Sequence, residues 1–143
     1  MKGFDIMKKS TKRIAATAAA VMMMLSGSAI GASAVSVERN KNYSCTHYKM
    51  YAYALIDAST NKAYIRNLTT CKTNCAVLYA QVSVSGVAEK HSQASNVKVG
   101  DILTPNTNIN SCRGKTAKYT SYYKASSAGA EKSKKTLELS LTV

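Results

Sequence analysis

The chain has 143 residues, 20 of them Lys or Arg and 7 Asp or Glu, so its formal net charge at pH 7 is +13. Its length fits one domain, and nine Tyr beside one Phe and no Trp exclude a core filled by Phe and Trp rings. No P-loop, H-E-x-x-H or dinucleotide-binding glycine pattern occurs, which excludes the classes of protein that those motifs define.

The first 34 residues have the layout of a secretory signal peptide. A lysine- and arginine-rich segment precedes an uncharged stretch that begins at Ile14, and residues 32–34, Ala-Ser-Ala, form a small-x-small cleavage site. The uncharged stretch is also long enough to span a bilayer, so a retained membrane anchor is the alternative. Serines and glycines in its second half favour cleavage. We therefore expect a signal-peptide helix over residues 1–34 and a single secreted domain over residues 35–143.

Residues 35–143 contain 15 Lys or Arg and 6 Asp or Glu, a net charge of +9, and all four cysteines of the chain. Leu, Ile and Val are scarce in this part, so its core alone stabilises the fold weakly. An even number of cysteines in an exported chain predicts two disulfides, each contributing about 2–4 kcal/mol. We expect Cys45 to pair with Cys71 or Cys75, and the remaining cysteine to pair with Cys112. A local Cys71–Cys75 bridge is the alternative.

Apolar residues alternate with a period of two from residue 48 onward, which predicts strands and not helices. Over residues 48–56, Tyr48 and Met50 begin one face, whereas Lys49 and Tyr51 begin the other. A turn over residues 57–61 leads to a return strand over 62–68, and the two strands form the clearest expected hairpin. The next strand is expected over residues 76–84.

The rest of the chain is expected to add short strands separated by turns. We expect strands over 35–37, 97–99, 117–125 and 137–143, with loops over 90–96 and 126–130 and a turn over 105–108. About seven short strands predict an all-β fold, a small antiparallel β-sandwich or a small barrel, stapled by disulfides.

Catalysis finds little support in the sequence. The acidic residues of the expected domain are isolated, and no serine lies in a G-x-S-x-G context. The only candidate bases are His47 and His91, so a small hydrolase, or an inhibitor of one, is a third hypothesis. Zinc ligands at Cys45, His47 and the Cys71-x-x-x-Cys75 pair are disfavoured, because an oxidising compartment disfavours free thiolates. We therefore expect a protein that is not an enzyme and that has no cofactor or metal.

Two sets of tyrosines and lysines are candidates for a binding surface. A tyrosine ring buries area while its hydroxyl still forms hydrogen bonds, and neighbouring lysines attract anionic groups. The alternative is that the tyrosines fill the core in place of Phe and Trp. The first set is Tyr43, His47, Lys49, Tyr51 and Tyr53, and the second is Lys118, Tyr119, Tyr122, Tyr123 and Lys124.

Charge and tyrosine placement together lead to a functional hypothesis. We expect a secreted, non-enzymatic binding module that engages an anionic or glycan-containing cell surface or an extracellular protein, with peripheral membrane contact allowed by its charge. Nucleic acid is not expected as a partner, because no motif for binding it occurs. The size, the leader, the tyrosine-rich alternation and the strand-only pattern resemble the small exported β-sandwich bacteriocins of Gram-positive bacteria, the lactococcin-972 type. That resemblance implies the alternative, a bacteriocin-like or other cationic antimicrobial protein or toxin.

Overall fold

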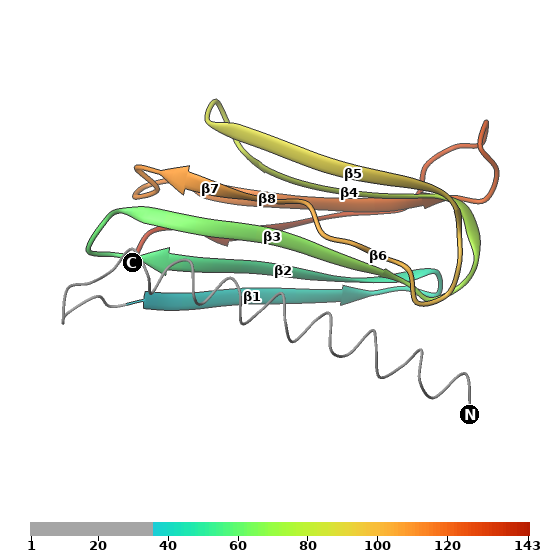
Figure 1. Ribbon diagram of the computed structural model, residues 1–143, viewed down its shortest axis with the longest axis horizontal. Coiled ribbons are helices and arrows are strands. Elements are labelled where there is room, and N and C mark those ends of the chain that lie inside the picture. Colours follow the sequence, from blue (N-terminus) through green and yellow to red (C-terminus); the bar gives the residue numbers. More distant parts are fainter. Residues whose placement is uncertain (1–35) are drawn as a thin grey trace. The chain divides into compact units, whose positions relative to one another are not determined.

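The computed structural model of the chain describes residues 36–143, and the expected signal peptide lies outside the described residues. The described part is all strand and turn, so the all-β expectation is confirmed (Figure 1). It contains no helix that could cross a membrane. Its strands are β1 (Ser36–Ser44), β2 (Tyr48–Asp57), β3 (Lys62–Cys71), β4 (Cys75–Val84), β5 (Ala88–Val97), β6 (Ile102–Leu103), β7 (Asn106–Asn110), β8 (Thr116–Lys124) and β9 (Lys132–Ser140).

Two antiparallel sheets form the sandwich. Sheet A has the order β1-β2-β3, and both β6 and β7 pair with β3. Sheet B has the order β5-β4-β8-β9. Figure 1 shows the sheets as stacked layers, with β4 and β5 in one and β1 and β2 in the other. The chain passes between the layers where β3 leads into β4.

The hairpin expected over residues 48–68 is confirmed as β2 and β3, whose register places Ala54 opposite Ile65. Asp57 holds the turn between them, because its Oδ1 accepts hydrogen bonds from the Ser59 hydroxyl at 2.6 Å, the Ser59 N–H at 3.0 Å and the Thr60 N–H at 3.2 Å. These donors, the Ser59 hydroxyl above all, lower the pKa of the Asp57 carboxyl.

Tyrosine supplies much of the bulk of the core between the sheets. Tyr48 and Tyr119 are fully buried. The Tyr48 hydroxyl donates to the carbonyl of Ser121 at 3.0 Å, and the Tyr119 hydroxyl donates to the carbonyl of Tyr53 at 2.8 Å. Burial raises the pKa of both hydroxyls. For these two residues, the interpretation of the tyrosines as core filling is the correct one.

The described part has nine strands, where about seven were expected. The expected loop over 90–96 belongs to β5, the expected turn over 105–108 overlaps β7, and β9 begins at Lys132, five residues before the expected strand. β5 is an edge strand whose side chains are mostly polar on both faces, so it carries no apolar alternation. Backbone pairing with β4 defines it instead.

The expected disulfides are not observed, because all four cysteines are thiols. The pairing of Cys112 is wrong for a geometric reason. Its N–H donates to the carbonyl of Asn61 at 3.1 Å, beside the turn before β3, whereas Cys71 ends that strand, about 30 Å away for ten extended residues. A disulfide needs Cα atoms within about 7 Å. Cys45 lies at the Cys71 end of the sandwich, because its N–H donates to the carbonyl of Tyr48, which is paired with Cys71.

Candidate functional site

The outer face of sheet A, turned away from sheet B, brings part of the first predicted set together. Tyr48 and Met50 of β2 join the core cluster, so the residues that alternate with them point outward. The register with β3 then places Tyr53 opposite Arg66 and Leu55 opposite Tyr64. We name this surface the aromatic face, and it consists of Lys49, Tyr51, Tyr53, Leu55, Tyr64, Arg66 and Leu68.

Tyr53 lies at the centre of the aromatic face. Its ring is nearly parallel to that of Tyr51, with an interplanar angle of 24° and centroids 6.1 Å apart. Its hydroxyl donates to Oε1 of Glu38 on β1 at 3.1 Å. Burial, followed by this bond to the carboxylate, raises the pKa of the Tyr53 hydroxyl, so it stays a donor at neutral pH. The guanidinium carbon of Arg66 lies 5.4 Å from the ring centroid, a cation–π contact.

Arg66 is the unusual residue of this face. Its side chain is buried, and its Nε and Nη1 have no hydrogen-bond partner. Within residues 36–143 the ion pairs join Lys118 to Glu138 and Lys134 to Glu131, so no acid neutralises Arg66. Burial raises the pKa of the neighbouring Tyr64 hydroxyl, and the guanidinium charge opposes that shift. Both Arg66 nitrogens are buried, so this charge is shielded from solvent as well as unpaired.

Exposed amides border the aromatic face on both sides. Two asparagines of β7 lie opposite Arg66 and Tyr64, and two of β1 lie opposite Tyr51 and Tyr53. An amide offers both donors and acceptors, which suits a ligand with hydroxyl or phosphoryl groups. These four residues are Asn40, Asn42, Asn106 and Asn108.

The structure places the first set in different environments. Lys49 is exposed, Tyr51 is half-buried and Tyr53 is buried. Tyr43 points to the inner side of β1, because it is paired with the core residue Met50, and it packs against the core. The His47 ring is stacked on Tyr123, with centroids 3.9 Å apart. The alternation of side chains along β2 is enough to predict that Lys49, Tyr51 and Tyr53 share one face. The positions of Arg66 and Tyr64 on that face follow only from the register between β2 and β3.

The second predicted set does not form one surface, because it combines both faces of β8. Tyr119 and Tyr123 belong to the core cluster. Lys118, Tyr122 and Lys124 alternate with them and lie on the outer face of sheet B. Tyr119 is fully buried, so we leave it out of any binding surface.

Sheet B carries a different aromatic arrangement on its outer face. The rings of Tyr79 and Tyr122 lie 4.6 Å apart at 12°, and those of Tyr79 and His91 lie 5.8 Å apart at 19°. Nearly parallel rings at these distances cover one another, which leaves little ring face for a ligand. Neither of the two sets predicted from the sequence includes Tyr79. Its neighbours in the strand, Leu78 and Ala80, are core residues, so alternation along β4 predicts that the Tyr79 ring points outward.

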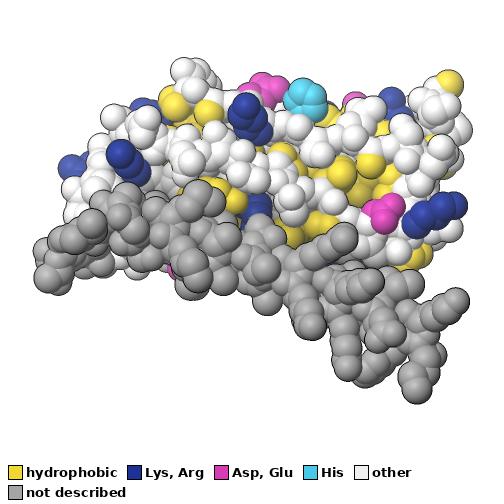
Figure 2. All heavy atoms as spheres, viewed as in Figure 1, with side chains coloured by type: hydrophobic (Ala, Val, Ile, Leu, Met, Phe, Trp, Pro, Cys, Tyr) yellow, Lys and Arg dark blue, Asp and Glu magenta, His cyan; other side chains and the backbone are white. Residues whose placement is uncertain are grey.

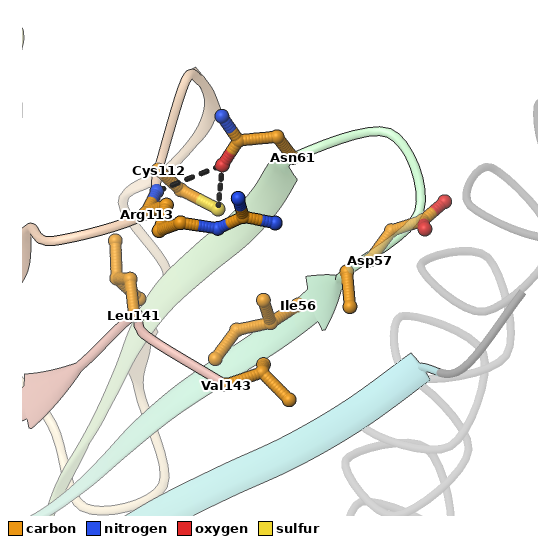
Figure 3. A pocket seen from close by; sticks show the side chains of 8 residues that line it. Ile56, Asp57, Asn61, Cys112, Arg113, Leu141 and Val143 are labelled. Carbon is orange, nitrogen blue, oxygen red and sulfur yellow. Dashed lines mark hydrogen bonds between the residues drawn. The ribbon is translucent and has the colours of Figure 1, made fainter.

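The hollow shown in Figure 3 is too small for a substrate. It measures about 20 Å³, enough for about one water molecule, and Ile56, Leu141 and Val143 line its floor. At its rim, Oδ1 of Asn61 accepts hydrogen bonds from the Arg113 N–H at 2.8 Å and from the Cys112 thiol at 3.6 Å. A wider depression of about 550 Å³ lies at the β4–β5 turn and is open to solvent.

Basic side chains do not gather in one place on the face that Figure 2 shows. Figure 2 shows Lys and Arg side chains spread across the visible face of the molecule. No group of three His, Cys, Asp or Glu side chains suited to a metal ion occurs in the described part of the chain.

Comparison of the chain with known protein families, with curated proteins and with solved structures found no match.

Proposed function

We propose that the chain is an exported, non-enzymatic binding module that engages an anionic or glycan-containing cell surface. The observation that carries this proposal is the aromatic face, where the exposed Lys49 and the half-buried Tyr51 lie beside Tyr53. Tyrosine is among the residue types that dominate binding energy at interfaces, because it combines a large contact area with directed hydrogen bonds. The net charge of +9 over residues 35–143 attracts anionic surfaces over a longer range.

The proposal includes one disulfide, between Cys71 and Cys75, formed after export. Cys71 ends β3 and Cys75 begins β4, and both belong to the core cluster. A bridge there would fix the connection between the two sheets, and closing so short a loop contributes about 2 kcal/mol.

Sedimentation with purified cell-wall fragments, over a range of salt concentrations, tests the binding function. We expect the purified protein to co-sediment at low salt and to be released steeply as salt approaches physiological strength, because exposed charges are screened. A Lys49→Gln, Tyr51→Ala variant should bind more weakly than a Lys118→Gln, Tyr122→Ala variant, which removes the same charge and the same kind of ring from the outer face of sheet B. No sedimentation, or sedimentation that ignores salt, would contradict the proposal.

A further inference from the structure

We infer that β5 is a self-association edge, where two copies of the chain pair their β5 strands antiparallel and so join their B sheets into one continuous sheet. The pairing follows from the strand edges of residues 36–143, and only its consequence for wall binding rests on the proposed function.

β5 is a long edge strand with an unused row of backbone groups. It has ten residues and pairs with β4 on one side. Within the described residues, no strand pairs with its other side, and no backbone hydrogen bond from a turn or loop reaches it. Alternate residues of such an edge present their N–H and C=O groups outward, which makes the edge a template for another strand.

The other strand edges of the sandwich carry features that oppose strand addition. β1 turns Arg39 and Lys41 toward the gap between the sheets, because they lie opposite the core residues Ala54 and Ala52. β9 has three lysines among its first four residues and an irregular register with β8. β6 and β7 have only two and five residues. Inward charges, lysines, irregular pairing and short length all protect a sheet edge from a second strand.

β5 lacks these protections over most of its length. Its charged residues, Glu89 and Lys90, lie next to the turn that follows β4, and the part from His91 to Val97 contains no Lys, Arg, Asp or Glu. Residues 35–143 carry a net charge of +9, so most approaches of two copies bring like charges together. A second copy's β5 is the partner that fits, because the other edges of that copy oppose pairing.

Symmetry restricts how two β5 strands can pair. When a two-fold axis relates two antiparallel strands, one residue lies opposite its own copy. With Ser92 or Gln93 on the axis, nine of the ten residues pair, and Glu89 and Lys90 both lie opposite uncharged residues. In both registers the two Gln93 side chains are direct or diagonal neighbours, about 5–8 Å apart.

The axis also sets which way the two copies face. It is perpendicular to sheet B, so both copies turn sheet A, which is stacked on sheet B, to the same side (Figure 1). The two aromatic faces then point toward one surface. On a wall that carries many copies of the ligand, the second face binds at a high effective concentration, which strengthens attachment without any new kind of contact.

Sedimentation velocity of the purified protein measures the pairing. A single pair of strands is a small interface, so we expect a monomer–dimer equilibrium with a Kd of about 10 µM. Gln93→Lys should weaken association about threefold to tenfold, because it brings two like charges together. Thr136→Lys is the matched control: it adds the same charge to an exposed residue of β9, the opposite edge of sheet B, and should change the Kd by less than about twofold.

A charge-reversed pair makes the test independent of any folding defect. Gln93→Glu should also self-associate weakly, whereas an equimolar mixture of Gln93→Lys and Gln93→Glu should form heterodimers about tenfold more tightly than either variant pairs with itself. On cell-wall fragments, Gln93→Lys should bind more weakly than Thr136→Lys, although both have the same net charge, because only the first loses the second aromatic face.

The outcomes are distinguishable. A monomer at concentrations up to about 200 µM, equal losses for Gln93→Lys and Thr136→Lys, or a mixture without heterodimers would each overturn the β5 pairing while leaving wall binding intact. Equal wall binding by the two lysine variants would overturn the shared orientation of the two aromatic faces. A dimer that does not sediment with walls would overturn the proposed function and leave the β5 pairing in place.

Discussion

Asn67 is fully buried and joins the two sheets through its amide group. Its Nδ2 donates to the carbonyls of Gln81 on β4 and Thr120 on β8, each at 3.1 Å, and its Oδ1 accepts the Thr69 hydroxyl at 2.8 Å. The Thr69 and Ser121 hydroxyls are 2.7 Å apart and complete the network. Because every group has a partner, this polar cluster is compatible with a core position.

We expect Asn67→Ala to lower the free energy of unfolding by about 2–4 kcal/mol, because two buried strand carbonyls lose the amide donor and the Thr69 hydroxyl loses one of its two partners. Urea unfolding measures the change. Asn106→Ala is the control on the exposed edge strand β7, and it should cost under about 0.5 kcal/mol. Equal effects of the two substitutions would show that the amide network does not stabilise the sandwich.

Cys75 links stability to pH in the reduced protein. Burial, and then the neighbouring Cys71, raise the pKa of its thiol from 9.0 to about 11. The folded state therefore favours the protonated thiol, so this contribution is complete below pH 9 and is lost as pH rises toward 11. We expect the free energy of unfolding to fall between pH 9 and 10, and to fall less in Cys75→Ala. Identical pH profiles for the two proteins would contradict this assignment.

Oxidation should distinguish Cys71 and Cys75 from Cys112. With oxidised glutathione as the oxidant, two thiols lose their protons and electrons, the Cys71–Cys75 bond forms, and glutathione is reduced to its thiol. We expect a non-reducing peptide map to show this bridge, with Cys112 recovered as a thiol that alkylates only on unfolding, because it is buried. A peptide joined through Cys112 would require the two ends of β3 to approach, and would disprove the topology.

β9 is an edge strand of sheet B and supplies apolar contacts to the core. Leu139 is buried, and Leu141, just after the strand, is buried and donates its N–H to the carbonyl of Lys115 at 2.9 Å. We expect removal of residues 132–143 to abolish cooperative thermal unfolding, because β8 would lose its edge partner and the core these two leucines. Removal of the exposed Val143 alone should leave the transition unchanged. A cooperative transition in the shorter chain would contradict this role.

The strands that the sequence predicts well are those with one apolar face. In β2 and β4, alternate residues such as Met50 and Leu78 face the core, so the period of two is visible in the chain. β5 and β7 are held by backbone pairing to β4 and β3 and carry mainly polar side chains, so no such signal exists. β9 begins five residues before the strand expected from the sequence, because its first residues are mostly lysines and carry no apolar alternation.

The candidate site was predictable only in part. Lys49, Tyr51 and Tyr53 follow from the alternation within one strand. Arg66 joins them because β3 pairs with β2 in a particular register, which the hairpin prediction alone did not resolve to single residues. The predicted pairing of Cys112 was wrong because the sequence does not show which end of β3 the segment around Cys112 contacts.

At the scale of the whole molecule, the proposed function gives charge and contact separate roles. Basic side chains are spread over the face that Figure 2 shows, so we expect long-range attraction to a polyanion to depend on the net charge. We expect short-range contacts to depend on the aromatic face, where Lys49 and Tyr51 lie. Attraction should therefore govern association, and the aromatic face should govern dissociation.

Two double variants of equal charge separate these roles. Lys49→Gln with Lys62→Gln alters the aromatic side of sheet A, and Lys90→Gln with Lys132→Gln alters sheet B; all four lysines are exposed. On immobilised cell-wall fragments, both variants should associate more slowly by a similar factor, because each lowers the net charge by the same amount. Only the sheet A variant should dissociate faster, by about threefold to tenfold, because the proposed binding surface includes its lysines and not those of sheet B. Equally fast dissociation of the two variants would mean that the wall fragments have no preferred face on the protein, and that charge alone holds them.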